Sequence, residues 1–137
     1  MHYQAISLVT ILVDDYDRAI DFYTQKLGFV LLEDTVLSPE KRWVRVAATP
    51  DAAFALLLAK AATEEQIHSV GHQSGGRVFL FLQTAQFWFD YYELCRRDIV
   101  FIREPQLESY GWVAVFEDLY GNKWDLIGPE NSLPAAP

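Results

Sequence analysis

The sequence has little cysteine and no long apolar run. Cys95 is the only cysteine among 137 residues, which excludes an intrachain disulfide and a metal site built from clustered cysteines. The apolar stretches are only long enough for β-strands, and no early segment combines a basic start, an apolar middle and a small-residue cleavage site. We therefore expect a cytoplasmic protein that neither crosses nor enters a membrane.

Positive charge is also scarce. The chain carries 11 Lys and Arg against 19 Asp and Glu, a formal net charge of −8, and it has no basic run. This charge repels phosphate backbones, so nucleic acid is not expected as a partner. The sequence also lacks a glycine-rich phosphate loop and a Gly-x-Ser-x-Gly elbow. Its 15% aromatic content suits a globular core and, equally, a pocket for a planar ligand.

An internal duplication is the main positive signal. An ungapped shift of 69 positions lays the second half on the first, with identities at Val9 and Val78, Asp21 and Asp90, Trp43 and Trp112, Val44 and Val113, Val46 and Val115, and Leu57 and Leu126. One copy is too small to close a core alone, so two copies are expected to pack together and enclose a space. Function is expected in that space.

Each copy predicts a β-α-β-β-β unit. A strand over 6–13 precedes a helix that Asp14 or Asp15 caps, whose apolar stripe begins at Tyr16 and which Gly28 ends. The other predicted strands are 29–32, 42–47 and 53–59 in the first copy and 77–82, 99–103, 112–116 and 123–127 in the second, where the helix covers 84–94. The predicted single domain has module one at 4–60, a mobile polar linker at 61–76, module two at 77–128 and a disordered tail at 129–137.

Two runs in this duplicated frame resemble a known family. They are VDDYDRAIDFY at 13–23, followed by Leu27-Gly28-Phe29, and EDLYGNKWDL at 117–126. The chain is similar over nearly its whole length to the vicinal oxygen chelate superfamily, which includes glyoxalase I, bleomycin-resistance proteins and extradiol dioxygenases. The resemblance implies an α+β fold in which two tandem βαβββ modules form a curved sheet around a cavity. It is specific for the fold and not for a reaction.

The resemblance also identifies where a metal would bind. In the metal-dependent members, His and Glu ligands come from four inward positions on the first and last strands of each copy, here Leu8, about Leu56, Arg77 and Asp125. Leucine has no lone pair to donate, and a fixed cation about 4 Å from a dication is unfavourable by several kcal/mol even at an effective dielectric of roughly 20. We therefore expect no metal and no cofactor, which counts against glyoxalase I and extradiol dioxygenase activity.

A second candidate metal site is the pair His68 and His72, which stand four residues apart. The flanking glycines favour a loop, and no carboxylate has a predicted place beside them. We expect both imidazoles to be exposed and not to bind metal.

Strand alternation predicts the cavity lining. If Leu8 and Arg77 point inward, Thr10, Leu12, Phe79 and Phe81 share their faces. If the helices cover Val44, Val46, Val113 and Val115, the cavity also receives Trp43, Arg45, Trp112, Ala114, Phe116, Phe54, Leu58 and Ile127. Apolar walls with few polar groups are typical of small-molecule sites. The predicted ligand-binding residues are Arg77, Asp125, Trp43, Arg45, Thr10, Phe79, Phe81 and Trp112.

The leading hypothesis is a glyoxalase/bleomycin-resistance-like protein that binds a small, partly aromatic, anionic molecule in the inter-module cavity without a metal. In this hypothesis Arg77 anchors the anion and Asp125, with a pKa lowered by the arginine, holds Arg77 in place. The Arg77 and Asp125 pair also has a purely structural interpretation, with the inward aromatics filling a core.

An enzyme of the same superfamily is the alternative. It would be of lyase, isomerase or dioxygenase type, with Asp125 as the catalytic candidate that accepts a proton or with metal ligands elsewhere in the chain. The resemblance, together with the prevalence of two-fold assemblies, also predicts a homodimer.

Overall fold

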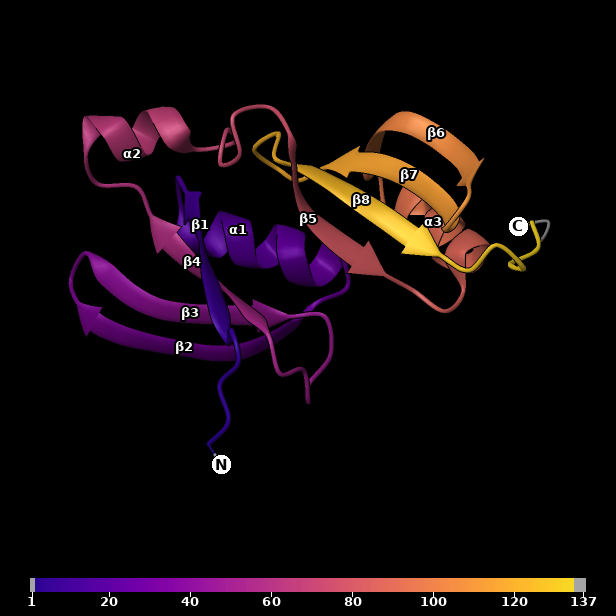
Figure 1. Cartoon of the computed structure of the whole chain (residues 1–137). Helices are drawn as coiled ribbons and strands as arrows, with labels where there is room; N and C mark the ends of the chain where they lie inside the picture. Colours follow the sequence, from indigo (N-terminus) through magenta and orange to yellow (C-terminus); the bar gives the residue numbers. More distant parts are fainter. Residues whose placement is uncertain (1, 135–137) are drawn as a thin grey trace. The chain divides into compact units, whose positions relative to one another are not determined.

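The computed structural model describes residues 2–134 and divides into two compact units between Val70 and Gly71. Each unit holds a four-stranded mixed sheet and follows the order β-α-β-β-β (Figure 1). The predicted α+β fold of two tandem βαβββ modules is confirmed. Among the described residues, no helix is long and apolar enough to cross a membrane.

The first sheet has the strand order β1-β4-β3-β2. Strand β1 (Leu8–Val13) runs parallel to β4 (Ala55–Lys60), and β3 (Lys41–Ala47) runs antiparallel to both β4 and β2 (Val30–Ser38). Helix α1 (Tyr16–Asp21) continues into a π-helical turn, η1 (Phe22–Lys26). Asp15 caps α1, because its carboxylate accepts a hydrogen bond from the Arg18 N–H at 2.8 Å.

The face of this sheet that α1 covers forms the core of the first unit. Alternate residues of three strands supply it, and all are at most 3% exposed: Ile11, Val13, Val44, Val46, Leu56 and Leu58. Ala19 and Tyr23 pack over them from the helix and its π-turn and are fully buried. The opposite side, which we call the first open face, carries Thr10, Leu12, Trp43, Arg45 and Leu57.

The second sheet repeats the order as β5-β8-β7-β6. Strand β5 (Val78–Gln83) runs parallel to β8 (Lys123–Gly128), and β7 (Gly111–Glu117) runs antiparallel to both β8 and β6 (Val100–Glu108). Helix α3 (Phe87–Arg96) covers one face with aromatic contacts. The Phe87 ring stacks on Trp112 with centroids 6.3 Å apart, and the Phe116 ring stacks on Trp124 at 5.6 Å.

The segment between the modules is partly helical. Helix α2 (Glu64–Ser69) occupies its first half, and Thr63 caps it by accepting from the Gln66 N–H at 3.2 Å. The prediction of a loop throughout 61–76 is therefore wrong, because Thr63 and Gln66 form a Thr-x-x-Gln helix start within this polar stretch. In the predicted tail, the Ser132 N–H donates to the Pro129 carbonyl in a turn, and residues 135–137 lie outside the described ones.

The two sheets match at an offset that differs from the shift of 69. Strands β3 and β7 begin 70 residues apart (41 and 111), and β4 and β8 begin 68 apart (55 and 123). Because side chains alternate between the two faces of a strand, changing the offset by one residue places every aligned side chain on the opposite face of the sheet. Leu57 therefore lies on the first open face, whereas Leu126, its partner in the shift, is buried toward α3.

This reversal corrects the predicted lining. Trp112, Ala114 and Phe116 face α3 and not the opposite side of the second sheet, since the Trp112 ring contacts Phe87 and the other two residues alternate with Trp112 along β7. Leu58 is likewise buried on the α1 side. Val113, Val115, Asp125 and Ile127 share the side away from α3, which we call the second open face.

Gly128 allows α3 to approach the second sheet. A Cβ atom placed on it would lie 2.5 Å from the Phe87 Cβ and 3.2 Å from the Phe87 Cα. Only glycine therefore fits where β8 ends beneath the first turn of α3, and β8 stays paired with Trp112 of β7 at this point.

We expect Gly128→Ala to destabilise the protein by about 1–3 kcal/mol, because the clash involves backbone and Cβ atoms that rotamer changes cannot relieve. Urea unfolding of both proteins measures this difference. An alanine without a clash would instead stabilise a strand by roughly 0.5–1 kcal/mol, so a stabilised variant would contradict this packing.

Candidate functional site

A pocket of about 450 Å³ opens in the first unit, where the ends of β1, β3 and β4 meet the start of α1 and α2. Two predicted ligand-binding residues, Thr10 and Trp43, line it. The complete lining is Thr10, Leu12, Tyr16, Glu40, Lys41, Arg42, Trp43, Leu57, Leu58, Ala59, Lys60, Ala62 and Gln66. Its apolar wall comes largely from the first open face, and its charged side chains come from the strand ends.

The pocket lies where β3 and β4 stop pairing. Their paired residues are Val44 with Leu58, Arg45 with Leu57 and Val46 with Leu56. One further step of two residues in this register would set Arg42 opposite Lys60, and no such pair forms within the described part of β3 and β4. The equivalent strands β7 and β8 pair over their whole length, as far as Trp112 with Gly128.

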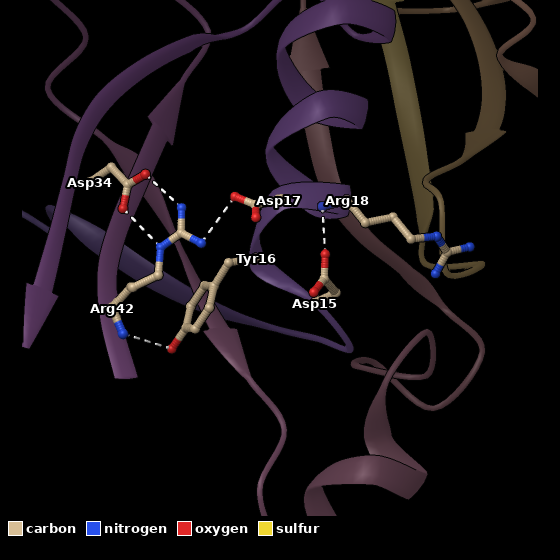
Figure 2. A network of polar contacts seen from close by, with 6 residues as sticks. All are labelled: Asp15, Tyr16, Asp17, Arg18, Asp34 and Arg42. Carbon is tan, nitrogen blue, oxygen red and sulfur yellow. Dashed lines mark hydrogen bonds and ion pairs between the residues drawn. The ribbon is translucent and has the colours of Figure 1, made fainter. Parts of the chain in front are cut away.

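The Arg42 backbone explains the end of the pairing. Its N–H donates to the Tyr16 hydroxyl oxygen at 3.2 Å, so a side chain of α1 occupies the donor that a β4 carbonyl would otherwise take (Figure 2). A buried backbone N–H requires one acceptor, and a phenol oxygen satisfies it. The hydrogen bond to Tyr16 thus replaces a backbone hydrogen bond between β3 and β4.

The Arg42 side chain holds this arrangement in place. Its guanidinium makes two hydrogen bonds to the Asp34 carboxylate, at 3.1 and 2.7 Å, and one to Asp17 at 3.0 Å (Figure 2). It also lies over the Tyr16 ring, 5.1 Å from the centroid. Hydrogen bonding from Arg42 lowers the pKa of Asp34, and the same contact raises the pKa of Arg42. Arg42 is therefore committed to fastening α1 to β2 and β3.

The remaining polar residue predicted on the first open face is Arg45. Its Nε donates a hydrogen bond to the Glu33 carboxylate of β2 at 3.0 Å. Arg45 pairs with Glu33 on one side and with Leu57 of β4 on the other, and Leu57 pairs in turn with Thr10 of β1. Arg45 lies on the predicted face but does not line the pocket. Its charge is already paired with that of Glu33.

The second open face carries Asp125 in a different setting from the one predicted. Asp125 pairs with Phe81 of β5 and with Val115 of β7, and Val115 in turn pairs with Arg103 of β6. Burial raises the pKa of Asp125, and the attraction of Arg103 opposes that rise. The predicted lowering of its pKa is wrong, because the nearby cation is Arg103 and the carboxylate is partly desolvated.

The predicted Arg77 and Asp125 pair does not form. Arg77 lies before β5 and is exposed, and within residues 2–134 its side chain makes no ion pair with Asp125. A register shift between Val78 and Leu80 separates Arg77 from the alternation of β5. Phe79 lies inside that shift, and Phe81 is 61% exposed on the face of Asp125.

Three of the four residues at the family's metal positions, two leucines and Arg77, offer no lone pair to a metal ion. Leu56 is buried toward α1, so the residue of β4 that matches Asp125 is Leu57. This correction exchanges one leucine for another and adds no donor atom. In the described range, no three His, Cys, Asp or Glu side chains come close enough to hold a cation. His68 lies in α2 and His72 beyond it, and both are exposed.

The comparisons with known proteins agree with this architecture. The chain belongs to the Glyoxalase/Bleomycin resistance protein/Dioxygenase superfamily, whose family model matches residues 5–126. It is 50% identical over 132 residues to an uncharacterized protein of Shewanella frigidimarina, covering 96% of this chain and 98% of that protein.

Two solved structures are similar over nearly the whole chain. One is UcmS2, with 30% identity, a TM-score of 0.81 and coverage of 92% of this chain and 98% of that one. The other is TnmS3, described as an antibiotic binding protein from Streptomyces sp. CB03234, with 28% identity, a TM-score of 0.75 and coverage of 94% and 98%.

Sequence reasoning missed the polar part of the pocket. It assigned Tyr16 to the apolar stripe of α1 and gave Lys41 and Lys60 no role. A signal for Tyr16 was present, because a buried phenol, unlike leucine at the same place in a stripe, needs a hydrogen-bond partner. That the partner is the Arg42 backbone, 26 residues away, is a tertiary contact that no local pattern reveals.

We expect Asp125→Asn to be more stable than the wild type at neutral pH. A folded-state pKa above the unfolded value, about 3.9, means that folding disfavours the charged carboxylate, so wild-type stability falls as pH rises through this window. The gain of the variant should vanish once the pH falls below that unfolded value. Thermal unfolding from pH 3 to pH 8 measures it, and a loss of stability at pH 7 would restore an ion pair as the better account.

Proposed function

We propose that the protein binds a small, partly aromatic, anionic molecule in the pocket of the first unit, without a metal. The observation that carries the proposal is the pocket itself, where Trp43 stands beside Leu12 and Leu57 and cationic side chains stand at the strand ends. Apolar walls supply affinity in such sites, and a few polar groups orient the ligand.

The unpaired cations of the pocket favour an anion. Arg42 is paired with both Asp34 and Asp17, whereas Lys41 and Lys60 line the pocket and make no ion pair within residues 2–134. Once Glu40 is counted, three cations and three carboxylates balance around the pocket, so the site is close to neutral on a chain of net charge −8. Two ammonium groups without a carboxylate partner in such a site favour an anionic ligand over a cationic one.

The relatives support binding as the role. TnmS3 is described as an antibiotic binding protein, and its structure is similar over 94% of this chain. By analogy, we propose sequestration of a small molecule rather than its turnover.

The alternative function is an enzyme that uses Asp125 for proton transfer. The observation in its favour is the raised pKa of Asp125, because a carboxylate with a higher pKa is a stronger proton acceptor. If the wild type turns over a substrate, and Asp125→Asn abolishes that turnover without loss of folding, the result would favour this alternative over a binding role.

We expect 2-naphthoate to bind the wild type and Trp43→Leu to weaken it about tenfold, since the variant removes the largest ring of the pocket wall. Isothermal titration calorimetry measures both affinities. Phe89→Leu is the control, because Phe89 is 60% exposed on α3, outside the pocket. Equal affinities of 2-naphthoate for the wild type and Trp43→Leu would contradict the proposed role of Trp43 in the pocket wall. A stoichiometric transition metal in untagged protein would contradict the proposal that the ligand binds without a metal.

We also propose a homodimer, because two-fold assemblies are the commonest closed oligomers and the family resemblance favours pairing of modules. Light scattering at micromolar concentration should give about twice the mass of one chain. A monodisperse monomer would contradict it.

A further inference from the structure

We propose that Tyr16 is a ligand-binding residue, whose phenolic hydrogen is donated to a carboxylate of the bound molecule in the gap where β3 and β4 part. This subsite rests on the proposed binding function and specifies the polar half of the ligand. The naphthyl-like half would lie against Trp43, which lines the same pocket.

The hydrogen-bonding state of Tyr16 is the first argument. Its oxygen accepts from the Arg42 N–H at 3.2 Å, and the residue is only 8% exposed. A phenol has one hydrogen to donate as well as lone pairs to accept with. Across residues 2–134, no acceptor for that hydrogen lies within hydrogen-bonding distance. A nearly buried donor of this kind, in the wall of a pocket, is suited to an oxygen atom of a ligand.

The second unit supplies an internal comparison. Phe87 begins α3 as Tyr16 begins α1, and Gly128 ends β8 as Lys60 ends β4. In the second unit, the Cα and Cβ atoms of Phe87 lie against Gly128, and β7 and β8 stay paired as far as Trp112 and Gly128. In the first unit, the Tyr16 hydroxyl oxygen accepts a hydrogen bond from the Arg42 N–H, and the pairing of β3 with β4 ends at Val44 and Leu58. The first unit thus has tyrosine and lysine where the second has phenylalanine and glycine, and its pocket lies beside the shortened ladder.

The other polar groups of the pocket are mainly donors. Lys41 and Lys60 make no ion pair within the described chain, and both line the pocket. The Gln66 amide oxygen accepts from the Ala62 N–H at 2.8 Å, which leaves the amide NH₂ group to donate. Glu40 is the exception. Donors from a phenol, an amide and two ammonium groups match a carboxylate, whose oxygens only accept.

The test compares 2-naphthoate with 2-naphthamide, which has the same shape and no charge. On the wild type, we expect the carboxylate to bind at least about tenfold more tightly, as charge-assisted hydrogen bonds require. In Tyr16→Phe, which keeps the ring over Arg42, we expect 2-naphthoate to weaken about tenfold. We expect 2-naphthamide to weaken by no more than about threefold, because its carbonyl oxygen accepts only a neutral hydrogen bond. Lys60→Met should reduce the same preference without removing it.

Tyr23→Phe is the matched control, since it removes a hydroxyl from a buried tyrosine of the adjoining η1 turn, outside the pocket. It should leave both affinities unchanged. Equal weakening of both ligands by Tyr16→Phe would show a merely structural hydroxyl and overturn the subsite. Equal affinity of the two ligands for the wild type would also overturn the subsite and leave the binding function standing. If neither ligand binds the wild type, the proposed function itself fails.

Discussion

The pairing of β4 with both β1 and β3 is the constraint on which the first unit depends. Because β4 is the last strand of the module but lies beside the first, it fixes which residues of three strands face α1 and which face away. The buried residues of these strands are thereby committed to the core. The side chains left on the first open face include Thr10 and Trp43, which supply the wall of the pocket.

The same pairing locates the polar end of the pocket. Every backbone donor near a core needs an acceptor, and at Arg42 the acceptor is a phenol of α1 rather than a carbonyl of β4. The Asp34 and Asp17 carboxylates hold Arg42 so that this contact persists. The corresponding end of the second sheet uses phenylalanine and glycine and stays closed. The duplicated units therefore keep one topology, but the β3–β4 ladder ends early beside a pocket whereas the β7–β8 ladder continues to Trp112 and Gly128.

The order of elements, the family and the face of Thr10, Trp43 and Arg45 could all be predicted from the sequence, because strand alternation and turn residues are local. The faces of β7 and β8 could not, since a one-residue change in the repeat offset reverses them. The pairing of Arg77 with Asp125 was wrong for a related reason, a register shift at the start of β5. The partner of the Tyr16 hydroxyl is a tertiary contact and lies beyond any sequence pattern.

The most direct measurement of the central claim is a crystal structure of the protein grown with 2-naphthoate. We predict that the naphthyl ring lies against Trp43, that one carboxylate oxygen lies within about 3 Å of the Tyr16 oxygen, and that β3 and β4 remain unpaired beyond Val44 and Leu58. A β3–β4 ladder that continues to Arg42 and Lys60, with the ligand absent from this gap, would contradict the account.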